Sequence, residues 1–423
     1  MIIMTQSLCS QYISSSSSSY HLTDERSHRM RQRVFITNPP TEPDLLFTTV
    51  NRMATETQQF YSLVAALNIR LFDHLDEPVS LDDLRQIVPH YEMIPPLLRI
   101  LVDCGFISDN QGLFQNTPVA STYFTSHSPY FQGAYLEKMR KKISELWVNL
   151  PDVIRNGPVV YDKKEFFCDM CLPPMAENAM TGRLQHVVRS IVAMPEFLSA
   201  HRMLDLGGGH GLYSIALASL KPDLTSIVFD LPEVTDTTCD YIIAHDMDEQ
   251  VKVFPGNFFT DELGTGYDII LSSSNPSGKK TGMISKIYNA LAPGGIFVNI
   301  QSSDTDVVDN PFTQLERSMW AIEGEPEWKS NGVKKQPFLS DTYVHTLHEC
   351  GFEIKQVEQI PDLCRDEFMV TMIICKKKEE LIQAPSLRIS LLSRKEREQT
   401  ITLTVDTKDP DWVKTLSLMK IPS

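Results

Sequence analysis

The sequence predicts an α/β fold, in which helices cover both faces of a mostly parallel sheet. Three observations predict it. Short apolar segments alternate with helical segments between residues 201 and 376. The turn Gly207–Gly211 directly follows one apolar segment, and Asp230 ends the next one. A glycine turn after one strand and an acid at the end of the following strand are typical of sheets that hold an adenosine-containing ligand.

Residues 43–124 predict a smaller domain, a winged helix, built from three helices and a hairpin. Apolar residues recur at helical spacing over Phe60–Leu71, and Ser80 is an N-cap signal for a second helix. The segment Pro95–Val102 predicts a third helix, and Phe106–Phe114 predicts two short strands around a glycine-containing turn.

Winged helices invite a DNA-binding interpretation, but the charge of this domain opposes it. Residues 43–124 contain ten Asp and Glu residues, four Arg and no Lys, and the whole chain has a net charge of −15. A recognition helix needs basic flanks that neutralise phosphate. We therefore expect no nucleic-acid partner, and we expect the apolar face of Phe60–Leu71 to form the interface of a homodimer.

The composition, with 42% hydrophobic and 22% charged residues, is that of an ordinary globular protein. No apolar run approaches the roughly 20 residues of a membrane helix, so we expect no membrane partner. The eight cysteines have no secreted-scaffold spacing, which favours the cytoplasm. Cys168 and Cys171 form the one C-x-x-C motif, and we expect them to pack rather than bind a metal.

Three further segments complete the predicted organisation. Residues 1–42 include a six-serine run and predict a disordered leader. Residues 125–200 are rich in large apolar side chains and predict linking helices that line an acceptor pocket. Residues 377–423 predict a C-terminal extension with two strands and a short last helix, over residues 387–392, 400–405 and 409–414.

Strands and helices are expected to alternate through residues 201–376. Strands are expected over residues 203–206, 226–229, 251–255, 267–272, 296–300, 352–360 and 368–376. Helices are expected to end near residue 220 and to cover residues 234–245, 281–291 and 341–350. The last two strands predict an antiparallel pair that closes the sheet.

The detail of the glycine turn indicates which class of adenosine ligand it serves. A dinucleotide fingerprint requires its third glycine at position 212, which is Leu212 here. The segment Asp205–Gly211 is instead similar to motif I of class I S-adenosylmethionine (SAM) methyltransferases. Glycine lets the backbone approach the ligand, and the carboxylate of Asp230 can accept hydrogen bonds from both ribose hydroxyls.

Residues 43–376 as a whole resemble the SAM-dependent O-methyltransferases that carry an N-terminal winged-helix dimerisation domain, a family that includes acetylserotonin, caffeate and polyketide O-methyltransferases. The resemblance rests on six segments, Leu67–Asp73, Asp205–Gly211, Phe229–Val234, Pro255–Phe259, Ala290–Gly295 and Gly351–Phe352. It implies a class I methyltransferase, Rossmann-like sheet, with SAM over the carboxyl edge of the strands.

The resemblance also implies a set of cofactor-binding residues. They are Asp205, Gly207, Gly209, Gly211, Asp230, Leu231, Asn257, Phe258 and Ser272. Asp205 and the glycines would hold the methionine end of SAM. Asp230 would hold the ribose, and Leu231 would pack near the adenine. Asn257 and Phe258 stand at the motif that contacts adenine in the family, where an amide can still hydrogen-bond the base edge.

The chain departs from the family where a general base is expected. The family places a histidine after the fourth core strand, but residues 271–280 contain none, and Ser273 and Asn275 stand nearest the missing base. A glutamate that often follows the next strand is Gln301 here. His210 lies inside the glycine turn, where we expect it to face cofactor or solvent. No residue is therefore assigned as the base.

These observations favour methyl transfer from SAM to a heteroatom of a small molecule, by default a hydroxyl oxygen. A phenol, with a pKa near 10, gains about 10²- to 10⁴-fold from a base, whereas a thiol at about 8.5 needs less help. The missing histidine therefore keeps open the S-methylation of a thiol, including a cysteine of a protein substrate. A catalytically silent SAM-binding scaffold is the third alternative.

Overall fold

The computed structural model describes residues 37–85, 91–302, 310–323, 340–361, 369–378, 387–390 and 402–405. Most of the predicted leader and the short helix predicted at residues 409–414 lie outside these ranges. The chain divides into two compact units, one ending at Leu63 and one beginning at Val64. Within the described ranges, no helix combines the length and apolarity that crossing a membrane requires.

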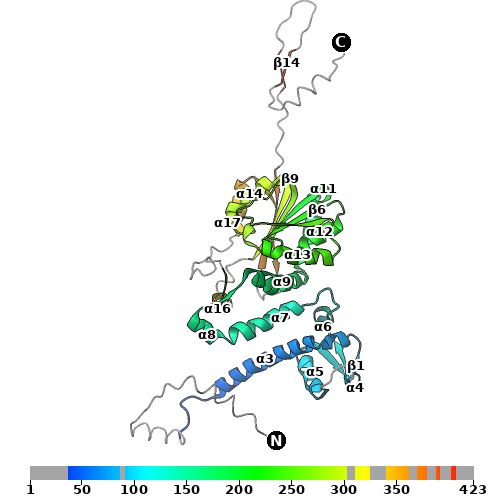
Figure 1. The fold of residues 1–423 in the computed structure, drawn as a ribbon, viewed down its shortest axis with the longest axis vertical. Helices are drawn as coiled ribbons and strands as arrows, with labels where there is room; N and C mark the ends of the chain where they lie inside the picture. Colours follow the sequence, from blue (N-terminus) through cyan, green and yellow to red (C-terminus); the bar gives the residue numbers. More distant parts are fainter. Residues whose placement is uncertain are drawn as a thin grey trace, which may run out of the picture. The chain divides into compact units, whose positions relative to one another are not determined.

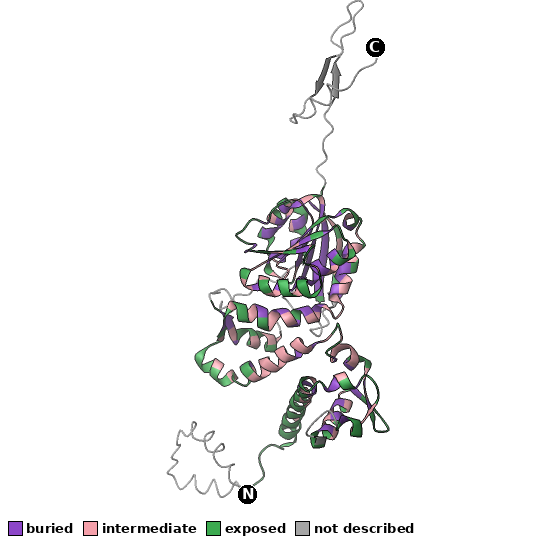
Figure 2. Cartoon of the chain, turned by 45° about the vertical axis from the view of Figure 1, so that its right-hand side comes forward, coloured by how far each residue is buried: buried purple, intermediate pink, exposed green. Residues whose placement is uncertain are grey.

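Helix α3 (Asp44–Asn68) begins in the first unit and is longer than the predicted segment Phe60–Leu71. Asp44 in its first turn complements the helix dipole, and Arg70, with a left-handed φ of 55°, follows its end. Figure 2 colours much of α3 as exposed. Five large apolar side chains near its start are each more than half exposed, namely Leu45, Leu46, Phe47, Val50 and Met53. Part of the predicted apolar face is instead buried in the chain's own core, as at Ala66 and Leu71.

The second unit starts with short helices and a small antiparallel sheet. Its helical elements are η1 (Leu71–His74), α4 (Leu81–Leu84), η2 (Tyr91–Met93) and α5 (Ile94–Asp103). Its strands, in the order β1-β3-β2, are β1 (Val79–Ser80), β3 (Leu113–Asn116) and β2 (Ile107–Asn110). Ser80 caps α4 as predicted, because its hydroxyl accepts the Asp83 N–H and the Asp83 carboxylate accepts the Ser80 N–H.

The predicted linking region is helical, with two π-helical segments. Its helices are α6 (Pro118–Tyr123), α7 (Gly133–Lys141), η3 (Lys142–Trp147), α8 (Leu150–Asn156), η4 (Glu165–Cys171), α9 (Leu172–Ala179), α10 (Arg183–Val192) and α11 (Pro195–Ser199). Strand β4 (Val159–Tyr161) pairs in parallel with β10 (Trp320–Ile322), which follows helix α16 (Pro311–Ser318). The sequence did not predict this pair, because its two partners lie far apart along the chain.

A seven-stranded sheet with the order β11-β12-β9-β8-β5-β6-β7 carries the rest of the unit. Its strands are β5 (Arg202–Leu206), β6 (Thr225–Asp230), β7 (Val251–Pro255), β8 (Tyr267–Ser273), β9 (Leu291–Ser302), β11 (Phe352–Pro361) and β12 (Met369–Lys377). The first five run parallel, and β11 and β12 form the predicted antiparallel pair. Strand β9 is longer than expected, because it begins at Leu291, before the Pro293–Gly295 turn.

Helices cover both faces of this sheet (Figure 1). The helices that follow its strands are α12 (Leu212–Leu220), α13 (Pro232–Ala244), η5 (Pro276–Gly278), η6 (Thr281–Met283), α14 (Ile284–Ala290) and α17 (Ser340–Glu349). Alternate strand residues serve alternate faces: Met203 packs with α10 and α12, whereas Leu204 packs with α14 and α17.

The C-terminal extension contains the two strands that the sequence predicted. Strand β13 (Leu387–Ser390) pairs in antiparallel with β14 (Thr402–Val405). The residues between and after these strands lie outside the described ranges.

Candidate active site

The order of the strands reverses beside β5. From β5 the chain continues to β6 and β7 on one side, and it then returns to β8 and β9 on the other side. Ligands of open α/β sheets bind at the carboxyl ends of the strands at such a switch point. The glycine turn after β5 and the ends of β6 and β8 lie at this edge, because all three strands are parallel neighbours.

The glycine turn presents backbone rather than side chains to this edge. Gly207, Gly209 and Gly211 have φ of 68°, 54° and 69°, which L side chains rarely adopt. A Cβ atom at Gly208 would lie 2.5 Å from Cγ of Asp205. A Cβ atom at Gly209 would lie 2.9 Å from a methyl group of Leu172 on α9. The turn is therefore a close-fitting cradle in which glycine is required.

The carboxylate of Asp230 holds the glycine turn to the end of β6. Its Oδ2 accepts the Gly209 N–H at 2.8 Å, and its Oδ1 accepts the Leu231 N–H at 2.7 Å. A carboxylate has about four lone-pair sites, so each oxygen retains one for a further donor. Burial raises the pKa of Asp230, while the two backbone N–H groups oppose that rise.

Asp205 lies beneath the turn and has no exposed surface. Its Oδ2 accepts the hydroxyl of Ser214 at 2.9 Å, and Ser214 in turn accepts the hydroxyl of Ser226 at 2.9 Å. The other oxygen, Oδ1, is buried and has no hydrogen-bond partner in the protein. An orphaned acceptor beside a glycine cradle is consistent with a ligand that brings its own donors.

His210 does not face solvent, so that part of the expectation for it was wrong. The side chain is 6% exposed, and its Nδ1 accepts the Leu212 N–H at 3.1 Å. Burial, with the nearby charge of Arg183, lowers the pKa of His210 to about 3. A ring this weakly basic cannot take a proton from a hydroxyl group at neutral pH.

The segment after β8 folds back onto the glycine turn. The Asn275 amide donates to the Leu206 carbonyl at 2.7 Å, and its Oδ1 accepts the Ser277 N–H at 3.0 Å. A Cβ atom at Gly207 would lie 2.9 Å from the Asn275 amide carbon. Asn275 therefore bridges β5 and β8 at the switch point.

Comparison with known proteins identifies the domain that carries the glycine turn. An O-methyltransferase domain model matches residues 174–324. An uncharacterized protein of Methanocaldococcus jannaschii is 28% identical over 347 residues, which cover 78% of this chain and 90% of that protein. The tetracenomycin polyketide synthesis 8-O-methyltransferase of Streptomyces glaucescens is 26% identical over 255 residues, covering 56% of this chain and 74% of that enzyme.

The fold agrees with these matches. Human N-acetylserotonin methyltransferase, solved in complex with SAM, superposes with a TM-score of 0.51 at 21% identity. The superposition covers 81% of this chain and the whole of that structure. The match identifies residues 174–324 as an O-methyltransferase domain, so the protein is a methyltransferase. The superposition shows that this methyltransferase has a class I methyltransferase fold with a helical N-terminal part.

The remaining residues expected at the cofactor differ in their surroundings. Leu231 packs with Cys168 and Leu172, against the elements that cover the glycine turn. Asn257 is exposed, and its Oδ1 accepts the Phe259 N–H at 3.0 Å, which leaves the amide N–H groups to donate. Phe258 is 9% exposed and packs in the core on the α14 side of the sheet.

Ser272 is buried within the protein, among its own side chains. It has no exposed surface, and its hydroxyl is bonded to the Ser277 hydroxyl at 2.8 Å and the Asn275 Oδ1 at 3.2 Å. A cofactor could reach Ser272 only if this network opened. Its position therefore supports a structural role beneath the site.

The structure gives neither Ser273 nor Asn275 the properties of a base. Ser273 ends β8, and Asn275 is an amide whose hydrogen bonds are used within the protein. Gln301 is fully buried, and its amide donates to Asn299 at 2.9 Å. No histidine occurs between His245 and His345. The methyltransferase thus has a neutral polar lining where its family usually has a base.

The C-x-x-C motif lies on the π-helical segment η4, over the cofactor edge. The Cys168 thiol donates to the Glu233 carbonyl at 3.0 Å, and burial raises the pKa of the Cys171 thiol. Throughout the described ranges, no three metal-ligating side chains gather closely enough to hold an ion. The six described cysteines are free thiols.

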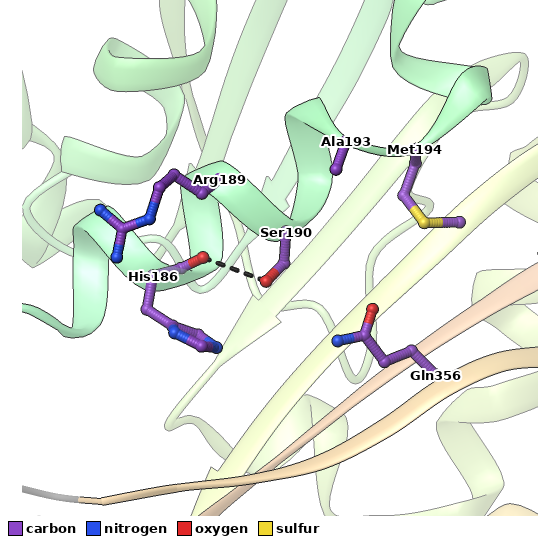
Figure 3. Close-up of a pocket in the computed structure, with 6 residues that line it drawn as sticks. All are labelled: His186, Arg189, Ser190, Ala193, Met194 and Gln356. Carbon is purple, nitrogen blue, oxygen red and sulfur yellow. Dashed lines mark hydrogen bonds between the residues drawn. The ribbon is translucent and has the colours of Figure 1, made fainter.

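Two surface hollows lie outside the glycine turn. One, of about 300 Å³, lies between α10 and β11 and is lined by His186, Arg189, Ser190, Ala193, Met194 and Gln356 (Figure 3). The other, of about 240 Å³, is lined by Thr122, Tyr123, Tyr130, Met180, Thr181, Gly182 and Gln185. The second falls largely in the segment from which the sequence predicted the acceptor pocket.

Sequence reasoning missed the buried partners of the site. Ser214 and Ser226 were not singled out, yet they connect α12 and β6 to Asp205. Glu177 on α9 accepts the N–H groups of Ala134 and Tyr135 at 3.0 and 2.8 Å and so caps α7. Serine and glutamate are common in helices and strands, so no local pattern marked these residues.

Proposed function

We propose that this methyltransferase moves the methyl group of SAM to a hydroxyl oxygen of a small molecule. SAM supplies the chemistry as a sulfonium, whose methyl carbon is open to in-line attack by the acceptor. The observation that carries the proposal is the glycine cradle with Asp230 bonded across it. The match of residues 174–324 to the O-methyltransferase domain supports the same reaction.

Each proposed cofactor contact follows from an available group. The glycine turn and Asp205 hold the methionine end, where the orphaned Oδ1 of Asp205 accepts a donor. Asp230 accepts the ribose hydroxyls with the lone pairs that its backbone partners leave. Leu231 packs against the adenine ring, and the Asn257 amide donates to the base edge. Ser272 is not included, since its hydroxyl is enclosed.

Calorimetric titration with SAM tests this cofactor site. Replacing Asp230 with Ala removes two charge-assisted acceptors, and we expect the affinity to fall at least about 100-fold. Asp236→Ala is the matched control, because Asp236 is an exposed acid on the adjacent helix α13. If Asp230→Ala has a normal circular dichroism spectrum and an unchanged affinity for SAM, the proposed cofactor site is wrong.

We place the acceptor in the hollow lined by Tyr130, Met180 and Gln185. Helix α9 leads from Leu172, which contacts the glycine turn, directly to Met180 at this hollow. The Oε1 atom of Gln185 is buried without a hydrogen-bond partner, so it can accept a donor from the bound molecule. A mixed aromatic and polar lining suits a small aromatic or amphipathic acceptor.

Without a base among the described residues, the acceptor's own ionisation supplies the nucleophile. Alignment within the site then provides the catalysis, since a well-oriented pair of reactants reacts as if at very high concentration. The logarithm of kcat/KM is expected to rise with unit slope until the pH reaches the pKa of each acceptor. A break at one fixed pH for acceptors of different acidity would instead show that an enzyme group removes the proton.

The neutral lining also supports a second candidate, methylation of a thiol. A thiol, with a pKa of about 8.5, is ionised far more than a phenol at neutral pH and is intrinsically more nucleophilic. A competition assay with a thiol and a phenol of similar shape, which measures methyl transfer to each, decides between the candidates. Preferential transfer to sulfur, including to a cysteine-containing peptide, would favour this second candidate.

We further propose a cytoplasmic homodimer with an N-terminal winged helix. The exposed apolar side chains of α3 between Leu45 and Met53 support an interface, since water-exposed groups of this kind mark contact surfaces. Light scattering is expected to give twice the 48.0 kDa mass of one chain. Replacing Phe47 with Glu should shift the mass to that of one chain.

A further inference from the structure

Asp205 is an acid in surroundings that disfavour its ionised form. The side chain has no exposed surface, and its Oδ1 has no hydrogen-bond partner. The Ser214 hydroxyl reaches its other oxygen at 2.9 Å, and the Ser214 backbone N–H adds a weaker contribution. An ion that loses its water and gains so few donors is less stable than the neutral acid.

The groups that face Asp205 do not offset this loss. From β6, the Asp230 carboxyl adds a like charge, and from α12 Ser214 adds only neutral donors, its hydroxyl and its backbone N–H. Burial raises the pKa of Asp205 to about 7; the Ser214 hydrogen bond opposes this rise, and the charge of Asp230 adds to it.

We propose that Asp205 carries a proton in the cofactor-free enzyme and releases it when the cationic methionine end of SAM binds. This inference rests on the proposed function, which places that end of SAM at the glycine turn. The O–H bond of the acid breaks, the electron pair stays on the Asp205 oxygen, and the proton passes to the buffer. A positive charge beside Asp205 favours its ionised form, so cofactor binding and proton release are linked.

The linkage has a defined pH range. Below about pH 7 the free enzyme holds the proton, so SAM must displace it, whereas above that pH the carboxylate is already formed. We therefore expect SAM to bind about eightfold more tightly at pH 7.5 than at pH 6.0. At pH 6.5 about three quarters of a proton should be released per SAM bound, and the share that Asp205 releases should fall to about one tenth at pH 8.0.

Calorimetry of the full chain with SAM, in phosphate and in imidazole buffer, measures this proton count. The two buffers differ in ionisation heat, so the difference in binding heat gives the protons released. At pH 6.5 an α-amino group with a pKa near 8 is protonated before and after binding, so it contributes little. Asp205→Asn should release no proton at this pH.

Two serine variants keep the test informative if Asp205→Asn fails to fold or to bind SAM. Ser214→Ala removes the hydroxyl that favours the carboxylate, so proton release should persist to pH 8.0. Ser226→Ala is the matched control, because Ser226 reaches Ser214 but not Asp205, and its release should equal that of the unaltered enzyme.

The outcomes separate this inference from the proposed function. SAM binding without proton release at pH 6.5 would overturn the inference and leave the cofactor site intact. Equal release by the unaltered enzyme and Ser214→Ala at pH 8.0 would also overturn it. Absence of SAM binding in both buffers would overturn the inference and the proposed function together.

Discussion

Acid should destabilise the enzyme through His210, and the size of the effect follows from its burial. The ring is 6% exposed, and its pKa lies near 3 in the folded chain, against 6.5 for an unperturbed histidine. Below pH 6.5 the unfolded chain therefore binds a proton at His210, and the folded chain does not. This contribution to stability is complete above pH 6.5 and is lost as the pH falls from 6.5 towards 3.

Between pH 7.5 and pH 5.0 the loss amounts to about 2 kcal/mol, because pH 5.0 is one and a half units below the unfolded pKa. The assay is urea unfolding of the unaltered enzyme and of His210→Gln at both pH values. A glutamine oxygen can still accept the Leu212 N–H, so the variant removes the titration and keeps the hydrogen bond. The unaltered enzyme should lose about 2 kcal/mol more than the variant.

The comparison cancels the opposite contribution of Asp205, which is present in both proteins. His345→Gln is the control substitution, since His345 is an exposed residue of α17. If the unaltered enzyme and His210→Gln lose the same stability on acidification, His210 is not a buried neutral ring and the reasoning is wrong.

Three further predictions follow from single positions. In Gly278→Ala the new Cβ would lie 2.0 Å from the Asn299 Oδ1, so the free energy of unfolding should fall by about 2 kcal/mol or more. Gly282→Ala is the control, because its Cβ would lie in open space and should change the free energy of unfolding by less than about 1 kcal/mol. Equal urea midpoints for the two variants would contradict this prediction. Ser80→Ala removes the cap of α4 and should lower the free energy of unfolding, measured by thermal unfolding, by about 1 kcal/mol. An unchanged free energy of unfolding would show that the capping box does not stabilise the protein. Met180→Trp fills the proposed acceptor hollow and should raise the KM for the acceptor at least about tenfold while SAM affinity, measured by calorimetry, stays constant; an unchanged KM would place the acceptor elsewhere.

Local patterns were sufficient to predict most of the elements and the cofactor edge. Short continuous apolar runs, which include Met203 and Leu204, mark strands buried on both faces, and they are readable from neighbours in the chain. The glycine spacing and Asp230 could be recognised for the same reason, because a tight turn and the end of a strand are properties of a few consecutive residues. The order of the sheet, and with it the side on which β8 joins β5, needed the structure.

The sequence by itself determined the α/β class, the strand positions, the glycine cradle and the absence of a histidine near β8. Tertiary structure alone decided the electrostatics of the site. It buried His210, left one oxygen of Asp205 without a partner, and turned Asn275 back onto Leu206. The physical reason is that pKa values and hydrogen-bond satisfaction depend on which atoms displace water around a group. Those atoms come from elements distant in sequence, such as Ser226 and Asp230, so no local pattern specifies them.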